Sequence, residues 1–309
     1  MDSVNILKEA VERDPDLDWE ADFLKRARGN AFYQKVMKEA LLSDMSQALG
    51  RVHEVAIEAA KKMAVGREVI WVLPTDQPLQ RIYLAKRGSV VRVGETGGLE
   101  MGERFTKVDI EVDREYVYDA CFTRSYIEDV PFPVLERAVA DGAQLLEEQL
   151  TKDILSLYEG VAAADLAGGA EISAVAAGTL SWADIVAGWN AVRKEGWNPD
   201  TIVMHPDQYA DLWNDDKFIH SFYFGELADV RRGILGETYL GMKIVVTDLA
   251  TPTKVHILDS KVAGVCLMRR DILTQPYEIP KDMREGVLLS IRYGLGTLRT
   301  TAIARITGA

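Results

Sequence analysis

One long amphipathic helix is the strongest prediction that this sequence makes. The segment FPVLERAVADGAQLLEEQLTKDILSLYEG has Pro133 where a first helical turn would begin and Gly160 where the helix would end. Between them the charged residues lie off a single apolar stripe. At a rise of 1.5 Å per residue the helix would be about 40 Å long, and few compact enzymes need so long a helix beside so long a hairpin. The stripe comprises Leu135, Val139, Leu146, Leu150, Ile154 and Leu157.

The residues before this helix predict a two-stranded hairpin over about residues 76–113. TKVDIEVD alternates strictly, with Val108, Ile110 and Val112 on one face and charged residues on the other, which is typical of a half-buried strand. SVVRVG predicts strand upstream, and Gly94–Glu103 holds four glycines in ten residues and predicts a mobile tip. Because an isolated two-stranded ribbon is marginally stable in water, the hairpin needs a partner surface, in this chain or another.

The α/β part of the sequence lies further along. SWADIVAGWNAVRKEGWNPD predicts a helix capped by Ser181 and Asp184 and ended by Gly196. TIVMHPDQY predicts a buried strand and then a helix whose first turn holds Pro206 and Asp207. His205 would therefore mark the point where a strand ends and a helix starts.

Metal and nucleophile chemistry finds little support in the spacing of residues. His205 and Asp207 are two residues apart across a proline turn, which is poor geometry for a ligand pair. HEVAIE, ending at Glu58, resembles half of a metal-binding helix, but no Glu-x-x-His pair completes it. The four histidines fall in separate predicted elements: His53, His205, His220 and His256.

The glycine-rich segments also read as turns rather than as binding loops. GETGGLEMG lacks the Gly-Lys-Ser/Thr ending of a phosphate loop, and RYGLGT, Arg292–Thr297, lies between two strand-like runs. No Gly-x-Ser-x-Gly elbow occurs. We therefore expect no catalytic residue, no cofactor site and no metal site. An enzyme built on residues 180–250 is the alternative, and it would require a pocket with perturbed ionisable groups.

The composition limits which kinds of partner the chain could bind. The net charge of −12 argues against a protein that grips nucleic acid through a broad basic face, although it allows one that encloses nucleic acid. We expect no membrane span, because no apolar run approaches roughly 20 residues, and no signal peptide, because the N-terminus is acidic. Cys121 and Cys266 occur singly in apolar runs and predict two buried thiols in a reducing compartment rather than a disulfide or redox pair.

The order of these parts resembles the major capsid proteins of tailed phages and head-tail viruses, which share the α+β Hong Kong 97 fold. The resemblance runs from about Arg67 to Gly308 and rests on four stretches in the same order. These are FTRSYIEDVPFPVLERAVADGAQLLEEQLTKDILSLYEG, TLSWADIVAGWNAVRKEGWNPDTIVMHPDQYADLWND, GILGETYLGMKIVVTD and MREGVLLSIRYGLGTLRTTAIARITG.

The resemblance implies a domain plan. A helical arm would reach one neighbouring subunit, an extended hairpin loop would lie over another, and axial domains would meet at five-fold and six-fold positions. The implied parts are the N-terminal helical arm 1–65, the first part of the peripheral domain 66–164 with hairpin loop 76–113 and spine helix 133–159, the axial domain 165–265, and the closing strands of the peripheral domain 266–309.

The resemblance also implies a function. The chain would be a structural protein and not an enzyme, forming pentamers and hexamers of an icosahedral shell around packaged double-stranded DNA, which it holds without sequence-specific binding. Scaffolding, portal and decoration proteins would be its partners, and it would assemble in the host cytoplasm into the virion capsid. No cofactor is implied.

Two points of the family pattern stay open. Some members link a hairpin lysine to an asparagine of a neighbour; Lys86 could be that lysine, but no asparagine follows Asn214, so we expect Lys86 to be a solvated charge. Encapsulins, the cellular shells around cargo enzymes, share the fold and are the alternative. The N-terminal arm with its long helix favours the virus, and the nucleic acid content of native particles would discriminate between the two.

Overall fold

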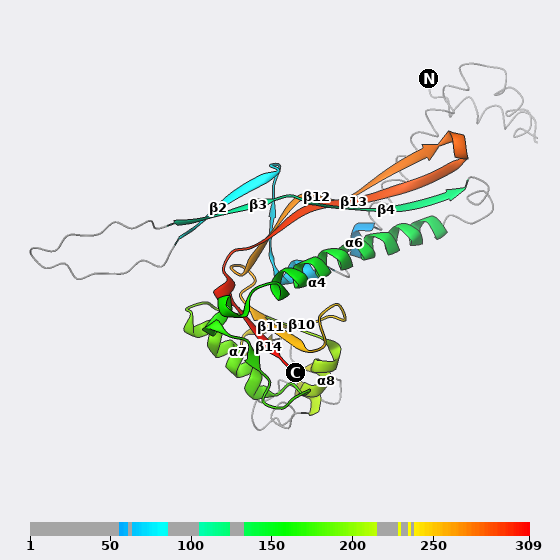
Figure 1. Ribbon diagram of the computed structural model, residues 1–309. Coiled ribbons are helices and arrows are strands. Elements are labelled where there is room, and N and C mark those ends of the chain that lie inside the picture. The colour runs from blue at the N-terminus through cyan, green and yellow to red at the C-terminus, as the bar shows by residue number, and fades with distance from the viewer. Residues whose placement is uncertain are drawn as a thin grey trace, which may run out of the picture. The chain divides into compact units, whose positions relative to one another are not determined.

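The predicted long helix is α6, Pro133–Glu159, in the computed structural model (Figure 1). Its buried stripe includes Val139, Leu150 and Ile154, each with no exposed surface, and it packs on β4 and β13. Gly142 faces β4 at close range: a Cβ there would be 2.2 Å from Cδ1 of Tyr118. The helix therefore needs glycine at this position in order to approach the sheet.

The structure describes residues 56–60, 64–85, 105–123, 133–214, 228–229, 234–235 and 238–309. Most of the predicted arm 1–65, the predicted strand at 89–94 and the predicted tip Gly94–Glu103 lie outside these residues. Within the described part of that region, residues 56–60 are helical, and α4, Val65–Val69, packs on α6.

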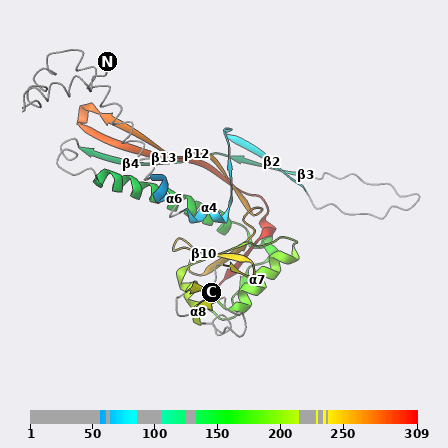
Figure 2. The same cartoon turned by 180° about the vertical axis from the view of Figure 1, so that it is seen from behind.

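A four-stranded sheet lies along α6, as both views show (Figures 1 and 2). Its order is β1-β12-β13-β4; β1 runs parallel to β12, and the other pairs are antiparallel. One face of β4 and β13 meets α6. The strands are β1 (Trp71–Pro74), β4 (Arg114–Thr123), β12 (Gly264–Ile279) and β13 (Arg284–Thr297).

Two strands of the predicted hairpin form a separate ribbon. β2, Leu79–Ala85, pairs antiparallel with β3, Phe105–Glu111. The predicted alternation is confirmed, since Val108 is half-buried and Ile110 and Val112 are buried while their charged neighbours are exposed. These apolar residues pack on β12 through Val265 and Leu267.

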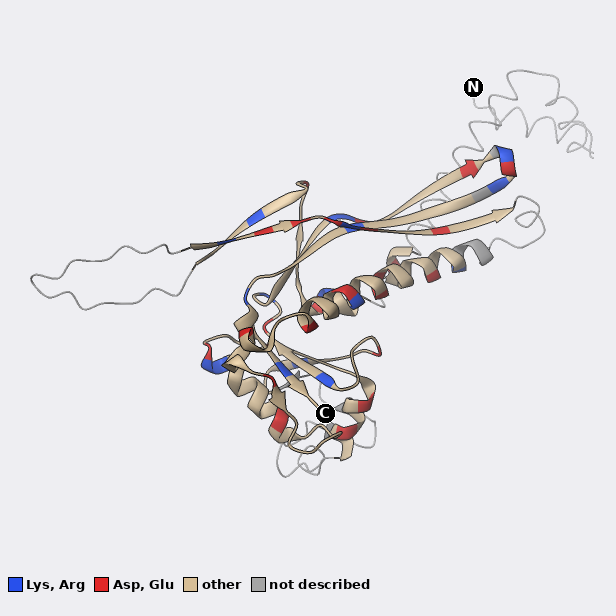
Figure 3. Ribbon diagram, viewed as in Figure 1, with Lys and Arg blue, Asp and Glu red and all other residues tan. Residues whose placement is uncertain are grey.

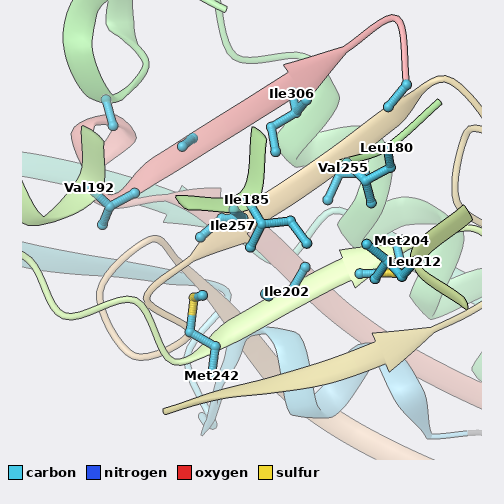
Figure 4. Packing of buried hydrophobic residues seen from close by; sticks show 13 residues of the cluster. Leu180, Ile185, Val192, Ile202, Met204, Leu212, Met242, Val255, Ile257 and Ile306 are labelled. Atoms are coloured by element: carbon cyan, nitrogen blue, oxygen red, sulfur yellow. The ribbon is translucent and has the colours of Figure 1, made fainter. Parts of the chain in front are cut away.

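A six-stranded sheet and two helices enclose the main hydrophobic cluster (Figure 4). The sheet order is β5-β14-β11-β6-β10-β9, and α7 packs on β14 and β11. Buried members of this cluster include Ile185, Val192, Ile202, Met204, Leu212, Val255, Ile257 and Ile306. The elements are β5 (Ile172–Ser173), α7 (Trp182–Lys194), β6 (Thr201–Met204), α8 (Pro206–Asn214), β9 (Thr238–Tyr239), β10 (Met242–Val246), β11 (Lys254–Leu258) and β14 (Ile303–Thr307).

The remaining elements are short. Among the strands that the structure describes, β7 and β8 pair only with each other. They and the 3-10 helices are β7 (Ala228–Asp229), β8 (Ile234–Leu235), η1 (Ala163–Asp165), η2 (Ala167–Gly169), η4 (Pro280–Asp282) and η5 (Thr300–Ala302).

The last strand lies in a different sheet from the two strands before it. The predicted domain plan groups residues 266–309 as closing strands of the peripheral domain; β14 pairs with β11 and β5 in the six-stranded sheet, while β12 and β13 lie in the four-stranded one. The chain changes sheet in the turn at η5. An apolar strand pattern indicates that a strand is buried, but it does not indicate which sheet buries it.

Two leucines of α6 provide a matched test of the packing. Leu150 is fully buried and Leu145 is 50% exposed. We expect Leu150→Ala to lower the free energy of unfolding by about 2–5 kcal/mol, since it removes buried methyl groups and leaves a cavity. Leu145→Ala should cost much less, and urea unfolding of both purified variants checks this. Equal losses would contradict the described packing of α6.

Candidate functional site

The predicted junction at His205 is confirmed. The residue lies between β6 and α8, its backbone N–H donates to Oε1 of Gln208 at 3.0 Å, and its Nδ1 accepts from the backbone N–H of Asp207 at 3.2 Å. The Asp207 carboxylate is 3.1 Å from Nδ1. These contacts close the first turn of α8 and give His205 a structural role at the start of that helix.

The other residues weighed from the sequence do not converge. His256 is buried within β11, whereas His53, His220 and Lys86 lie outside the described residues. In the part of the chain that the structure describes, no group of three or more His, Cys, Asp or Glu side chains could hold a metal ion. None of the described helices is both long and apolar enough to span a membrane.

Both cysteines are free thiols in the structure. Cys266 on β12 is buried, as predicted, and burial raises the pKa of its thiol to about 12. Cys121 on β4 is only partly buried, which departs from the prediction of two buried thiols. The two belong to strands on opposite sides of β13.

What the structure does bring together is a set of polar contacts that fasten α6 to the strands. Near the middle of the helix, Arg67 forms ion pairs with Glu147 and with Asp271, the latter with Nη2 and Oδ1 2.6 Å apart. The side chain of Glu147 is only 1% exposed. Burial raises the pKa of Glu147, and the Arg67 guanidinium opposes that rise. Because Arg67 belongs to α4, its two ion pairs link α4 both to α6 and to β12.

A second contact centres on Asp153 of α6. Its Oδ2 accepts from the hydroxyls of Tyr116 and Tyr293, each at 3.0 Å, and lies 2.7 Å from Nη1 of Arg114. Its Oδ1 accepts from Nε2 of Gln149 at 3.0 Å. A single carboxylate thus binds β4 and β13 at once.

A third contact closes the C-terminal end of α6. Arg305 of β14 is buried, and its guanidinium donates to the carbonyl oxygens of Glu159, at 2.9 Å, and Val161. Its Nη1 is also 3.3 Å from the Glu171 carboxylate. The last carbonyls of a helix have no partner within the helix and carry its negative dipole end, so a cation there is stabilising.

The ribbon β2–β3 has two unlike faces. One face packs inward, where Gly296 of β13 admits Ile110: a Cβ on that glycine would be 2.5 Å from Cδ1 of Ile110. The other, the outward face, exposes 57% of Tyr83 and 59% of Phe105. Arg81 and Asp109 pair across the strands on this same face, with Nε and Oδ1 2.6 Å apart.

A family model described as phage capsid protein matches residues 110–306 of this sequence. The chain belongs to the phage capsid protein family. No match emerged among curated protein sequences. The fold of this capsid protein is the α+β Hong Kong 97 fold, as the sequence predicted.

Solved structures support this assignment of the fold. The capsid structure of the cyanophage P-SCSP1u is similar with a TM-score of 0.63 at 14% identity, covering 78% of this chain and 86% of that one. The structure of Mycobacterium phage Che8 has a TM-score of 0.59 at 16% identity, and the match covers 74% of this chain and 84% of that one. A virus-like particle from Pyrococcus furiosus has a TM-score of 0.61 at 13% identity, and the match covers 83% of this chain and 98% of that one. At such low identity the likeness shows the fold alone.

Sequence reasoning missed the residues that fasten α6 in this capsid protein. Asp153 was placed off the apolar stripe as an ordinary charge, and Arg67 and Arg305 were not singled out. Only Arg305 carried a signal, since a lone arginine inside the otherwise apolar AIARIT must find a buried partner. The partner itself, 146 residues away in sequence, could not be read from that pattern.

Two aspartates of the capsid protein test the Asp153 contact. Asp153→Ala leaves two tyrosine hydroxyls and Arg114 without their shared acceptor, and we expect a loss of about 2–4 kcal/mol in the free energy of unfolding. Asp109→Ala removes an exposed pair with Arg81 and should change stability little. Guanidinium unfolding of both variants checks this. The structural role of Asp153 is wrong if its variant is as stable as the Asp109 control.

Proposed function

We propose that copies of this capsid protein assemble, as pentamers and hexamers, into a closed icosahedral shell that encloses packaged double-stranded DNA. The observation that carries the proposal is the ribbon β2–β3, whose outward face exposes large apolar side chains. Exposed aromatic residues beside polar ones are typical of protein interfaces. We infer a structural role rather than an enzymatic one, because the chain belongs to a capsid protein family and His205, weighed as a catalytic base, closes a helix turn.

The ribbon supports assembly because it is unsupported on one side. Tyr83 and Phe105 lie on the outward face, where the described chain does not cover them. Two-stranded ribbons gain stability from a third surface, and closed point-group symmetry lets every copy supply that surface to another. A neighbouring copy is therefore the proposed occupant of the outward face.

The domain plan enters the proposal in revised form. We assign the axial domain to about residues 165–263 together with 303–309, because β14 completes the six-stranded sheet. The peripheral domain then comprises about 66–164 and 264–297, with α6 as its spine. The arm 1–65 would reach a neighbouring copy.

The charges are compatible with enclosing DNA without reading its sequence. Blue and red segments are intermixed along the described strands and helices (Figure 3), and the net charge of the chain is −12. A wall of this kind does not attract phosphate strongly, so the DNA would have to be driven in by other means. Portal, scaffolding and decoration proteins are the expected partners.

The first test is to find shells and determine their content. Negative-stain microscopy and sedimentation of the purified protein, with co-expressed scaffolding if it is needed, should give closed uniform particles. Nuclease-protected double-stranded DNA inside native particles supports the virion capsid. Particles filled with a cargo enzyme and free of DNA would instead support an encapsulin-type shell, and failure to form particles with and without scaffolding would contradict assembly.

A pair of double variants tests the outward face. Tyr83→Ser with Phe105→Ser removes two exposed aromatic rings, and we expect loss of closed shells with retained folding, because both side chains are more than half exposed. Tyr83→Phe with Phe105→Tyr keeps the apolar area and should still form shells. Electron microscopy counts the particles, and circular dichroism checks the fold. Normal shells from the serine variant would refute the interface.

A further inference from the structure

A buried histidine lies in the layer where α6 meets the six-stranded sheet. His256 is 1% exposed, and neither ring nitrogen has a hydrogen-bond partner in the described chain. Its neighbours Val255 and Ile257 point into the main hydrophobic cluster, so strand alternation turns His256 to the opposite face, towards the end of α6. A buried polar group without a partner costs stability, and this position therefore requires an explanation.

Charged groups from three elements surround the imidazole. Arg305 of β14 is its cross-strand neighbour, Lys254 is two residues away on the same face of β11, and Glu159 comes from the last turn of α6. On its other side, β6 places Val203 opposite the histidine. The pKa of His256 is lowered to about 4, chiefly by burial; the Glu159 carboxylate opposes this shift, whereas Arg305 and Lys254 add to it.

The same charged groups hold α6 against the sheet. Arg305 donates to the last carbonyls of α6, and the Glu159 carboxylate accepts from Oγ1 of Thr251 at 2.6 Å and lies 3.5 Å from Nζ of Lys254. A proton on His256 adds a positive charge directly beside these contacts. A buried cation needs a partner or water, but the Glu159 carboxylate is already paired with Lys254, and Arg305 is already paired with Glu171.

We propose that His256 makes the joint between α6 and the six-stranded sheet acid-sensitive, so that protonation of its imidazole opens the contact between the end of α6 and β11–β14. With a neutral imidazole the joint is closed. In the open joint the imidazole meets water and takes up a proton with its ordinary affinity. The inference does not depend on shell assembly, since every group it uses lies in one chain.

The direction of the pH dependence follows from proton binding. The open form binds one proton more than the closed form between the ordinary pKa of 6.5 and the lowered value of about 4. Over that interval each unit of falling pH favours the open form by up to about tenfold. Above pH 6.5 the closed joint keeps its full stability, and the stability is lost as the pH falls towards 4.

Hydrogen exchange of the full-length chain tests the joint. Exchange is followed by mass spectrometry between about pH 6.5 and 4.5, with rates divided by the chemical exchange rate at each pH. We expect the protection of amides at the end of α6 and in β11 to fall by up to about 100-fold. His256→Gln, whose side chain binds no proton, should retain most of that protection. His205→Gln removes a histidine outside the joint and should behave like the wild type.

Either of two results would overturn the proposal: an equal loss of protection in the wild type and in His256→Gln, or no loss in the wild type. If His256→Gln does not fold, NMR titration of the wild-type imidazole decides instead. A His256 ring that stays neutral well below pH 6.5 and gains its proton together with loss of protection supports the joint. A ring that titrates near pH 6.5 while the amides stay protected refutes it.

Discussion

The burial of one stripe of α6 by β4 and β13 is the contact on which the rest of the described fold depends. A helix of this length is stable in water only if its apolar side is covered, and long strands are stable only if one face is dry. Gly142 allows the two layers to approach closely under the ring of Tyr118. The ribbon then packs on the strands that this contact positions, and the six-stranded sheet adjoins the C-terminal end of the helix.

Apolar packing alone would leave the position of α6 along the sheet poorly defined, because a stripe of similar aliphatic side chains tolerates small shifts. The polar contacts remove that freedom. Asp153 must meet both Tyr116 and Tyr293, and Arg305 must meet the carbonyls that end the helix. Each contact joins residues distant in sequence, and each loses its geometry if the helix slides by one turn. We therefore expect these buried polar groups to fix the position of α6 more than to add net stability.

The sequence predicted those elements whose evidence is local. Periodicity predicted the bounds of α6 and the alternation in β3, and capping predicted the strand end at His205. Capping also predicted the start of α7, where the Asp184 carboxylate accepts from both the backbone N–H and the hydroxyl of Ser181. The sheet of β14 could not be predicted, because the pairing of β11 with β14 is long-range and the same apolar pattern suits either sheet. His256 was read as one of four scattered histidines for the same reason: apart from Lys254 of its own strand, its neighbours come from α6, β14 and β6.

The two faces of the ribbon are consistent with each copy folding before a neighbouring copy covers the outward face. Arg81 and Asp109 bind the two strands across the outward face, and Ile82, Val108 and Ile110 pack inward. Register is therefore set within one chain, since a shift by one residue would exchange the two faces. Tyr83 and Phe105 take no part in that packing and remain exposed on the same face as the ion pair. If copies assemble as proposed, the aromatic surface is already in place when a neighbour arrives, so little ordering of the ribbon opposes association.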